Sequence, residues 1–254
     1  MSPAETVGVN SSRNVVLIPA RLRSTRLPDK PLAMIRGEPM IVHVWRRAME
    51  AGLGPVIVAC AEPSIAAAID AVGGRAVLTD PELPSGTDRI YAALQEVDPD
   101  RAFDRVINLQ GDMPTLDPAC LHDVLAPFEL PGIDIATLAD PTDDESEKTD
   151  PNTVKAIISF RTPEIGEALY FTRANAPWGD GPVYHHIGLY AFTRDALDRF
   201  AALAPSPLER REKLEQLRAL ENGMRIGVKL VEAVPFGVDT PADLMKARKI
   251  LGDG

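Results

Sequence analysis

Four cations gather after an apolar run near the start of the chain. Residues 15–18 read Val-Val-Leu-Ile, and Arg21, Arg23, Arg26 and Lys30 then fall within ten positions. Such a run is typical of a buried parallel strand, and open α/β sheets bind ligands beyond the carboxyl ends of these strands. Arginine forks and a lysine point charge suit a triphosphate. A solvated basic loop is the alternative, but this reversal of sign in a chain of net charge -10 favours an anion site.

Two aspartates stand after other apolar runs. Asp112 ends Gln-Gly-Asp at 110–112, and Asp239 lies within Gly-Val-Asp-Thr-Pro at 237–241. An aspartate at the carboxyl end of a strand is a frequent Mg²⁺ ligand in nucleotide enzymes. Each also has an ordinary explanation, an Asx turn for Asp112 and a helix start for Asp239. Brought together, the two would form a Mg²⁺ site that neither makes alone.

The segment Ser-Gly-Thr-Asp-Arg at 85–89 is typical of a helix start that faces a ligand. Gly86 permits close approach of a ligand to the backbone, and Thr87 can cap the following helix. A nucleobase or a ribose would fit there, although many helix caps have the same pattern.

A histidine pair and a polar helix segment form the last candidate group. Adjacent residues of a strand point to opposite faces, and no third ligand has a fitting spacing from His185 and His186, so zinc is not expected. His186 could face a polar ligand, and a structural histidine explains it equally well. Glu215 and Gln216 lie in a predicted helix and are further polar candidates.

These segments need a scaffold that places strand ends side by side. Through the first 140 residues the hydrophobic pattern alternates between strand and helix, which predicts an α/β fold with a mostly parallel, doubly wound sheet. The expected strands are 15–18, 55–60, 76–78, 105–110 and 133–138, and the expected helices are 39–51, 64–72, 88–97 and 118–128.

The second part of the chain has a different pattern. The acidic stretch 140–150 is typical of a mobile surface loop. We expect a flexible tail over 1–13 and a single domain over 14–254, because no segment resembles a linker. Strands are expected at 154–160 and 183–192, around a Pro- and Gly-rich excursion at 176–182, and helices at 208–222 and 240–250, the last capped by Thr240.

The composition excludes several classes of protein. Of the 254 residues, 45% are apolar and 25% charged, which suffices for a large aliphatic core. Cys60 and Cys120 are too few for a disulfide framework or a zinc cluster, so buried reduced thiols are expected. A pI near 4.9 disfavours nucleic acid and anionic membranes as partners. No apolar run reaches the roughly 20 residues of a membrane span, and we expect a cytoplasmic protein.

Taken in order, the motifs resemble those of the 3-deoxy-D-manno-octulosonate cytidylyltransferases, from Asn14 to about Leu251. The opening loop also fits cytidylyltransferases for sialic acid and related sugars. Later segments narrow the resemblance: Asn-Leu-Gln-Gly-Asp at 108–112, Pro-Asn-Thr-Val-Lys at 151–155, His-Ile-Gly-Leu-Tyr at 186–190 and Leu-Glu-Gln-Leu-Arg at 214–218.

The resemblance implies a reaction, a cofactor and an assembly. The anomeric hydroxyl of the acid sugar 3-deoxy-D-manno-octulosonate (Kdo) would attack the α-phosphate of CTP, giving CMP-Kdo and pyrophosphate for lipopolysaccharide. Mg²⁺ would be the cofactor, and a smaller C-terminal part with β structure would bind the sugar and form a homodimer. The implied site residues are Arg21 and Lys30 on the triphosphate, Asp112 and Asp239 on Mg²⁺, Ala20, Ser85, Gly86 and Arg89 on the nucleoside, and Gln110, Arg173, His186, Glu215 and Gln216 on Kdo.

Several positions depart from the family pattern. Met113 stands where Glu is usual, His185 where Arg or Lys is usual, and Leu83 where a polar residue is usual, while Cys60-Ala61 replaces Thr-Asp. An 8-amino-Kdo or another acid sugar is therefore an open alternative substrate. A catalytically silent nucleotide-binding protein is the alternative from another class. An oxidoreductase is disfavoured because no Gly-x-Gly-x-x-Gly loop follows the first strand.

Overall fold

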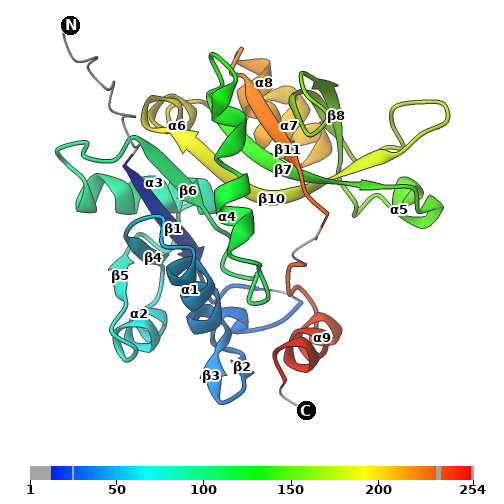
Figure 1. Ribbon diagram of the computed structural model, residues 1–254. Coiled ribbons are helices and arrows are strands. Elements are labelled where there is room, and N and C mark those ends of the chain that lie inside the picture. Colours follow the sequence, from blue (N-terminus) through cyan, green and yellow to red (C-terminus); the bar gives the residue numbers. More distant parts are fainter. Residues whose placement is uncertain (1–12, 25, 233–235, 253–254) are drawn as a thin grey trace, which may run out of the picture.

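The computed structural model describes residues 13–24, 26–232 and 236–252, so almost all of the expected tail lies outside the described residues. Within these ranges nine strands form one sheet, in the order β5-β4-β1-β6-β10-β7-β11-β9-β8 (Figure 1). A separate hairpin joins β2 (Met34–Ile35) and β3 (Glu38–Pro39). The sheet strands are β1 (Asn14–Ala20), β4 (Val56–Cys60), β5 (Arg75–Leu78), β6 (Arg105–Asn108), β7 (Ile135–Thr142), β8 (Lys155–Phe160), β9 (Ile165–Thr172), β10 (Val183–Thr193) and β11 (Ile226–Leu230).

Helices cover both faces of this sheet, as predicted. Val16 and Ile18 of β1 pack in one core with residues of α1 and α4, whereas Val15 and Leu17 pack in a second core with residues of α3, α6 and α8. Because successive side chains of a strand point to opposite faces, β1 contributes to a hydrophobic core on each face of the sheet. The helical segments are η1 (Lys30–Leu32), α1 (Met40–Glu50), α2 (Pro63–Asp70), α3 (Gly86–Val97), α4 (Ala119–Asp123), η2 (Ala126–Glu129), α5 (Glu145–Thr149), α6 (Arg194–Ala201), α7 (Pro207–Glu212), α8 (Gln216–Glu221) and α9 (Pro241–Leu251).

The parallel arrangement holds in only one half of the sheet. Strands β5, β4, β1 and β6 are parallel neighbours, and β7 is parallel to β11. Between these groups lies β10, which is antiparallel to both β6 and β7, and β8 and β9 form an antiparallel pair. The sheet is therefore mixed. The hydrophobic pattern of one strand does not encode the direction of a partner that lies far along the chain, which is why the prediction missed this insertion.

Three segment predictions were wrong. The helix predicted over 118–128 ends early and continues as η2, because Pro127 cannot donate to a helical ladder. The loop predicted over 140–150 contains the end of β7 and then α5, where Asp144 caps the helix by accepting from the Ser146 amide at 2.8 Å. The helix predicted over 208–222 is broken by Lys213, which adopts a left-handed φ of 57°. Strand β9 and helix α6 had not been predicted.

The segment before α9 and α9 itself pack against elements from the first half of the chain. Helix α9 begins at the predicted cap Thr240, whose hydroxyl accepts from the Asp243 amide, and it packs in a small third core with Ile35 and Met40. The backbone amide of Val238 donates to the Asp112 carbonyl at 2.8 Å. Residues more than a hundred positions apart are thereby fixed at one edge of the sheet.

Candidate active site

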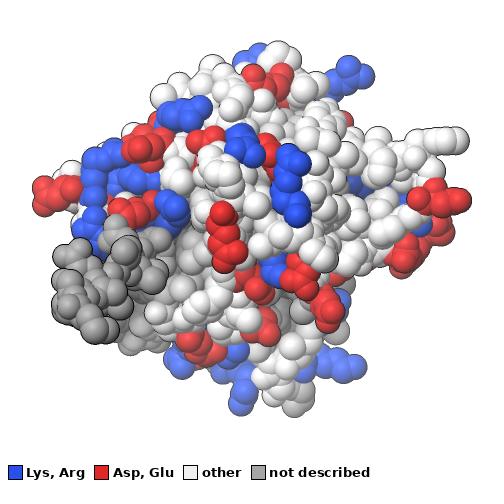
Figure 2. Space-filling model, turned by 45° about the horizontal axis from the view of Figure 1, so that its top comes forward, with Lys and Arg blue, Asp and Glu red and all other residues white. Residues whose placement is uncertain are grey.

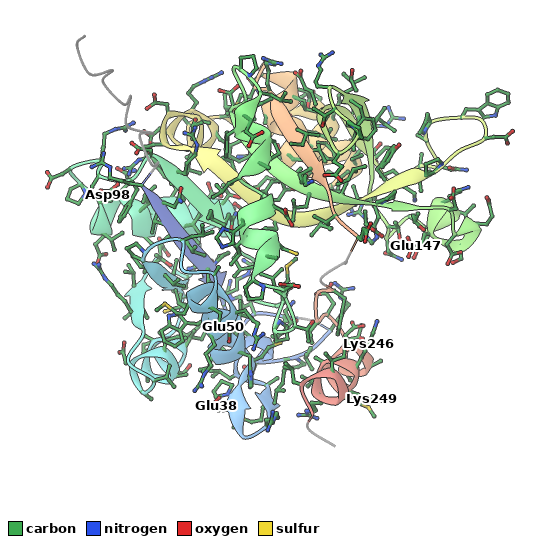
Figure 3. All side chains as sticks on the ribbon, viewed as in Figure 1. Glu38, Glu50, Asp98, Glu147, Lys246 and Lys249 are labelled. Atoms are coloured by element: carbon green, nitrogen blue, oxygen red, sulfur yellow. The ribbon has the colours of Figure 1, made fainter. Side chains whose placement is uncertain are left out.

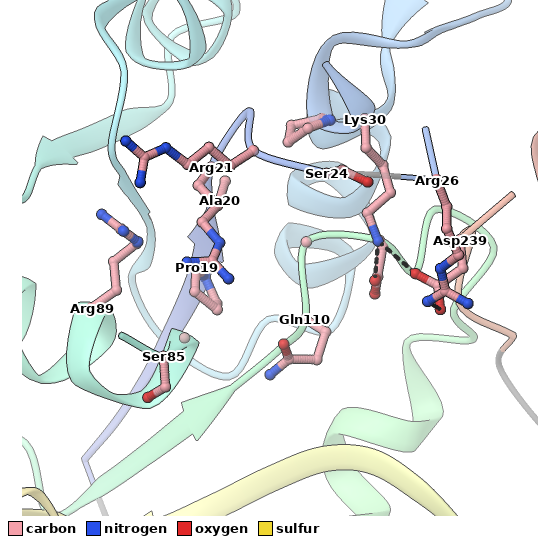
Figure 4. Close-up of a pocket in the computed structure, with 15 residues that line it drawn as sticks. Pro19, Ala20, Arg21, Ser24, Arg26, Lys30, Ser85, Arg89, Gln110 and Asp239 are labelled. Carbon is pink, nitrogen blue, oxygen red and sulfur yellow. Dashed lines mark hydrogen bonds and ion pairs between the residues drawn. The ribbon is translucent and has the colours of Figure 1, made fainter. Parts of the chain in front are cut away.

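The carboxyl ends of β1 and β6, the start of α3 and the segment before α9 enclose a cavity of about 810 Å³ (Figure 4). The backbones of Gly111 and Pro19, which both line the cavity, lie so close that a Cβ on Gly111 would be 2.7 Å from the Pro19 carbonyl oxygen. Nine of the thirteen residues assigned from the sequence line this cavity: Ala20, Arg21, Lys30, Ser85, Gly86, Arg89, Gln110, Asp112 and Asp239. Sequence positions from 20 to 239 therefore meet in one place.

The two candidate metal ligands hold the ammonium group of Lys30 between them (Figure 4). Its Nζ lies 2.7 Å from Asp112 Oδ2 and 2.9 Å from Asp239 Oδ1. The exposed Arg26 adds a second cation to Asp239, with Nη2 2.8 Å from Oδ2. Burial disfavours the charged form of Lys30, but the charges and hydrogen bonds of its two carboxylate partners outweigh burial and raise its pKa. Lys30 is therefore positively charged in this site.

Two carboxylates suit a divalent ion that keeps other oxygen ligands. Among the described residues no group of three or more His, Cys, Asp or Glu side chains could hold a metal ion. Mg²⁺ is commonly bound by one or two carboxylates together with water and substrate phosphates, so Asp112 and Asp239 fit it as a substrate-dependent ion. They do not form a closed protein cage.

The other end of the cavity carries a buried arginine with a free donor. Arg89 is 1% exposed, and its Nη1 donates to Thr79 Oγ1 at 2.5 Å and to the Asp80 carbonyl at 3.1 Å. Its Nη2 is buried without a partner. Burial, followed by the nearby charge of Arg21, lowers the pKa of Arg89. A buried donor of this kind needs an acceptor, which a bound nucleobase could supply.

Ser85, rather than Thr87, caps helix α3. The Ser85 hydroxyl oxygen accepts from the Asp88 amide at 3.1 Å, which places Gly86 in the first helical turn. A Cβ on Gly86 would lie 3.2 Å from Pro19 Cγ. The prediction of Thr87 as the cap was wrong, because Thr87 is buried and its hydroxyl donates to Glu215 Oε2 at 2.6 Å.

Two of the four remaining sugar candidates border neighbouring cavities. Glu215 lines a cavity of about 580 Å³ that also contains Ser85, so this space adjoins the nucleotide cavity. Glu215 and Gln216 both line a small apolar cavity beside Tyr190. Glu215 Oε1 and Gln216 Nε2 are buried without hydrogen-bond partners among the described residues, and Glu215 Oε1 lies 3.7 Å from Arg218 Nη2. Gln216 Nε2 is therefore a donor that a ligand could satisfy.

Arg173 and His186 lie outside the lining of these cavities. Arg173 donates from Nε to the Glu212 carbonyl and from Nη1 to the Pro151 carbonyl, both at 2.9 Å. His186 Nε2 is 3.1 Å from Thr137 Oγ1, and its ring packs edge-on against Phe171. Burial lowers the pKa of His186 to about 3, so the ring is neutral. These contacts correspond to the structural interpretation of His186.

Some parts of the site had no signal in the sequence. Thr79 and Asp80 hold Arg89, but nothing in their local pattern marks them as its partners. The bond between Thr87 and Glu215 joins positions 128 residues apart. Arg23, which was grouped with the phosphate cations, also pairs with Glu82 at 3.0 Å. Only the helix-start pattern of 85–89 pointed to this region.

Comparison with known proteins shows the family of this chain. A cytidylyltransferase family model matches residues 15–226. A 3-deoxy-manno-octulosonate cytidylyltransferase of Parvibaculum lavamentivorans is 62% identical over 237 residues, which cover 93% of this chain and 92% of that protein. The protein of the same name from Paramagnetospirillum magneticum is 57% identical over 238 residues, covering 93% of this chain and 97% of its own. This chain belongs to the 3-deoxy-manno-octulosonate cytidylyltransferase family.

A solved structure of lower sequence identity has the same fold. CMP:2-keto-3-deoxy-manno-octonic acid synthetase complexed with CTP has a TM-score of 0.88 and 38% identity to this chain, covering 95% of this chain and 99% of its own. The α/β nucleotidyltransferase architecture expected of a 3-deoxy-manno-octulosonate cytidylyltransferase is thereby confirmed.

The residues that depart from the usual 3-deoxy-manno-octulosonate cytidylyltransferase pattern do not line the 810 Å³ cavity. Met113 is 6% exposed and belongs to an apolar core. His185 Nδ1 lies 3.8 Å from Glu147 Oε2 of α5, a residue labelled in Figure 3. Cys60 is buried, as predicted, and burial raises the pKa of its thiol to about 11.

Two general properties of the described residues concern membrane-spanning helices and surface charge. No helix among them is both long enough and apolar enough to cross a bilayer. On the face in Figure 2, acidic and basic side chains are interspersed rather than gathered by sign.

Proposed function

We propose that this protein transfers CMP from CTP to the anomeric hydroxyl of Kdo, giving CMP-Kdo and pyrophosphate. The observation that carries this proposal is the single cavity in which the residues assigned to triphosphate, nucleoside and metal meet. In the reaction, a bond forms between the anomeric oxygen and the α-phosphorus, the bond from that phosphorus to the β-phosphate oxygen breaks, and the hydroxyl proton leaves. Catalysis then consists mainly of positioning two anions and stabilising charge on pyrophosphate.

The loop after β1 supplies the cations for the triphosphate. Arg21 and Lys30 line the cavity, and Lys30 is positively charged. We assign both to the phosphate oxygens, with Lys30 nearest the α-phosphate, where charge develops as pyrophosphate leaves. Asp112 and Asp239 would hold Mg²⁺, which when bound screens the phosphate charges and lowers the pKa of the attacking hydroxyl.

The nucleoside is assigned to the opposite end of the same cavity. The Ala20 backbone, Ser85 and Gly86 form its wall beside the start of α3, and Arg89 contributes the unpaired Nη2. A cytosine oxygen or ring nitrogen would satisfy that donor, which supports a nucleobase in this position.

The sugar is assigned to the side of the site that faces α8. Gln110 lies in the nucleotide cavity, with Nε2 held by Asn108 Oδ1 at 3.1 Å, and Glu215 lines the adjoining cavity. Gln216, His186 and Arg173 enter the proposed set through the family resemblance, with Arg173 as the partner of the Kdo carboxylate. Because His186 and Arg173 do not line these cavities, a contact with the sugar requires that their present contacts rearrange. No contact of Met113 or His185 favours 8-amino-Kdo, which remains the alternative substrate.

We further infer a homodimer formed through the second half of the chain. The 173–182 connection between β9 and β10 projects from the body of the molecule (Figure 1), and Trp178 on it is fully exposed. Leu169 of β9 is 62% exposed. Large apolar side chains in this region suit an interface. Light scattering is expected to give twice the chain mass of 27.5 kDa, and a mass equal to one chain would contradict the dimer.

Pyrophosphate release from CTP and Mg²⁺ tests the reaction. Kdo, 8-amino-Kdo and sialic acid are compared as acceptors with the wild type and with Asp112→Ala. We expect turnover with Kdo that EDTA abolishes and that the variant loses. Preference for another sugar would change the substrate assignment, and binding of CTP without turnover on any sugar would indicate a silent binding protein.

A further inference from the structure

The position between Asp112 and Asp239 is occupied by a side chain of the protein itself. The Lys30 ammonium contacts one oxygen of each carboxylate, and the Lys30 side chain is only 16% exposed. Mg²⁺ lies about 2.1 Å from its oxygen ligands. An ion bound to these same two oxygens would therefore need the volume that the ammonium fills.

The segments that carry the two carboxylates are joined by a backbone hydrogen bond that does not involve Lys30. The Val238 amide donates to the Asp112 carbonyl, and this bond ties the segment that carries Asp239 to the end of β6. The Lys30 side chain has four methylene groups and reaches the pair from η1, a separate segment. The backbone bond thus holds together the segments that carry the two aspartates. The long Lys30 side chain, which comes from another segment, can turn to another partner without breaking that bond.

A triphosphate in the same cavity offers Lys30 another partner. The cavity is lined by Lys30 and by both aspartates, so a phosphate chain there lies within reach of the ammonium. Once Lys30 turns to the phosphates, its charge no longer opposes a divalent ion at the carboxylates.

We propose that Lys30 is an internal counter-ion that occupies the metal position in the nucleotide-free enzyme, and that the triphosphate releases this position by binding Lys30. The proposal rests on the metal site assigned under the proposed function. It makes nucleotide and metal binding cooperative, with the divalent ion bound weakly until CTP is present.

Mn²⁺ binding without nucleotide, followed by electron paramagnetic resonance of the free ion, tests this directly. Lys30→Met is expected to bind Mn²⁺ about tenfold more tightly than the wild type, because a contacting positive charge is removed. Lys30→Arg keeps the charge and is expected to remain weak. Arg26→Gln removes an exposed cation that pairs with Asp239 but, among the described residues, not with Asp112, and it should have a smaller effect.

The outcomes separate this inference from the metal assignment. Equal or weaker binding in Lys30→Met, together with loss of binding in Asp112→Asn, would overturn the inference alone. Mn²⁺ binding that persists in the double variant Lys30→Met, Asp112→Asn would place the ion elsewhere and overturn the assigned metal site. If Arg26→Gln increased the affinity for Mn²⁺ as much as Lys30→Met, the cause would be a general charge effect, which would overturn the counter-ion role of Lys30. Circular dichroism checks folding, and Lys30→Gln replaces Lys30→Met if that variant is unfolded.

Discussion

The hydroxyl of Thr87 donates to the Glu215 carboxylate at 2.6 Å and joins the helix at the nucleotide cavity to the segment that begins α8. Thr87 is 5% exposed, and the second oxygen of Glu215 makes no hydrogen bond among the described residues but lies 3.7 Å from Arg218 Nη2. The helix start beside the 810 Å³ cavity and the start of α8 are thus joined by a part-buried hydrogen bond, which together with the Arg218 ion pair orients Glu215.

Replacing Thr87 by Val should affect the sugar more than the nucleotide. The variant keeps the shape but removes the donor, so we expect a loss of about 1–3 kcal/mol in unfolding free energy. We also expect a raised KM for Kdo with little change in the KM for CTP. Urea denaturation and steady-state kinetics measure both effects. Thr87→Ser, which retains the hydroxyl, is the control, and an equal rise in both KM values would contradict the orienting role.

Arg89→Lys should weaken CTP binding. Lysine lacks the second forked nitrogen, so the contact proposed for Nη2 is lost while the positive charge remains. A hydrogen bond from a charged donor contributes about 1.5–3 kcal/mol, which corresponds to roughly a 10- to 100-fold rise in the Kd for CTP. Calorimetric titration of CTP measures this change. Arg105→Lys, at a partly buried arginine outside the cavity, is the control, and unchanged affinity in Arg89→Lys would remove Arg89 from the nucleobase site.

The amino-acid sequence predicts the nucleotide half of the molecule well because that half consists of local units. Residues 15–18 and 55–60 are aliphatic runs closed by turns, and β1 and β4 form there. Ligands follow the ends of such strands, so Lys30 and Asp112 could be assigned without the fold. A meeting of Asp112 and Asp239 was predicted only as a condition for a metal site, and the contact of Lys30 with both was not predicted.

The second half was less predictable because its pairings are between distant segments. The acidic residues of 140–150 indicated a loop, yet Asp144, Glu145 and Glu147 stabilise the amino end of α5. The apolar repeat of 208–222 continues through Lys213, although its left-handed backbone ends α7. A residue with positive φ that is neither Gly nor Asn leaves little signal in a sequence.

The ion pair between Asp98 and Arg194 should contribute to stability without affecting catalysis. Arg194 Nη1 donates to Asp98 Oδ2, and the two residues are 4% and 6% exposed. Asp98 lies at the end of α3 remote from Ser85 (Figure 3), and its carboxylate also accepts from the Ala102 amide at 2.6 Å.

We expect Asp98→Ala to lower the unfolding free energy by about 3–5 kcal/mol, because a buried guanidinium loses its hydrogen-bonded carboxylate and keeps only the more distant Asp198 carboxylate at 3.7 Å. Urea denaturation measures the loss, and KM for CTP at a temperature where the variant is folded should match the wild type. Glu145→Gln, which breaks an exposed pair with Lys148, should change stability little. A similar stability for both variants would show that the buried pair contributes no more than a surface pair.

His186 should make stability fall as the pH decreases below neutrality. Burial depresses its pKa from 6.5 to about 3, so between these values the unfolded chain binds a proton that the folded chain does not. Above pH 6.5 His186 does not lower the free energy of unfolding. As the pH falls from 6.5 toward 3, its preferential protonation in the unfolded chain lowers that free energy by at most about 1.4 kcal/mol per pH unit. Urea denaturation at pH 7, 6 and 5 is expected to show a steeper decline in the wild type than in His186→Gln.

Nuclear magnetic resonance of the imidazole protons tests the same assignment in the folded protein. The His186 signal should stay at its neutral position from pH 7 to pH 5, because the ring is buried against Phe171 and beside Thr137, where burial disfavours the charged imidazolium. His185→Gln is the control for the neighbouring histidine, whose pKa burial also lowers. Titration of His186 near pH 6.5 would mean that the ring reaches solvent, and would favour a polar ligand over the structural contacts.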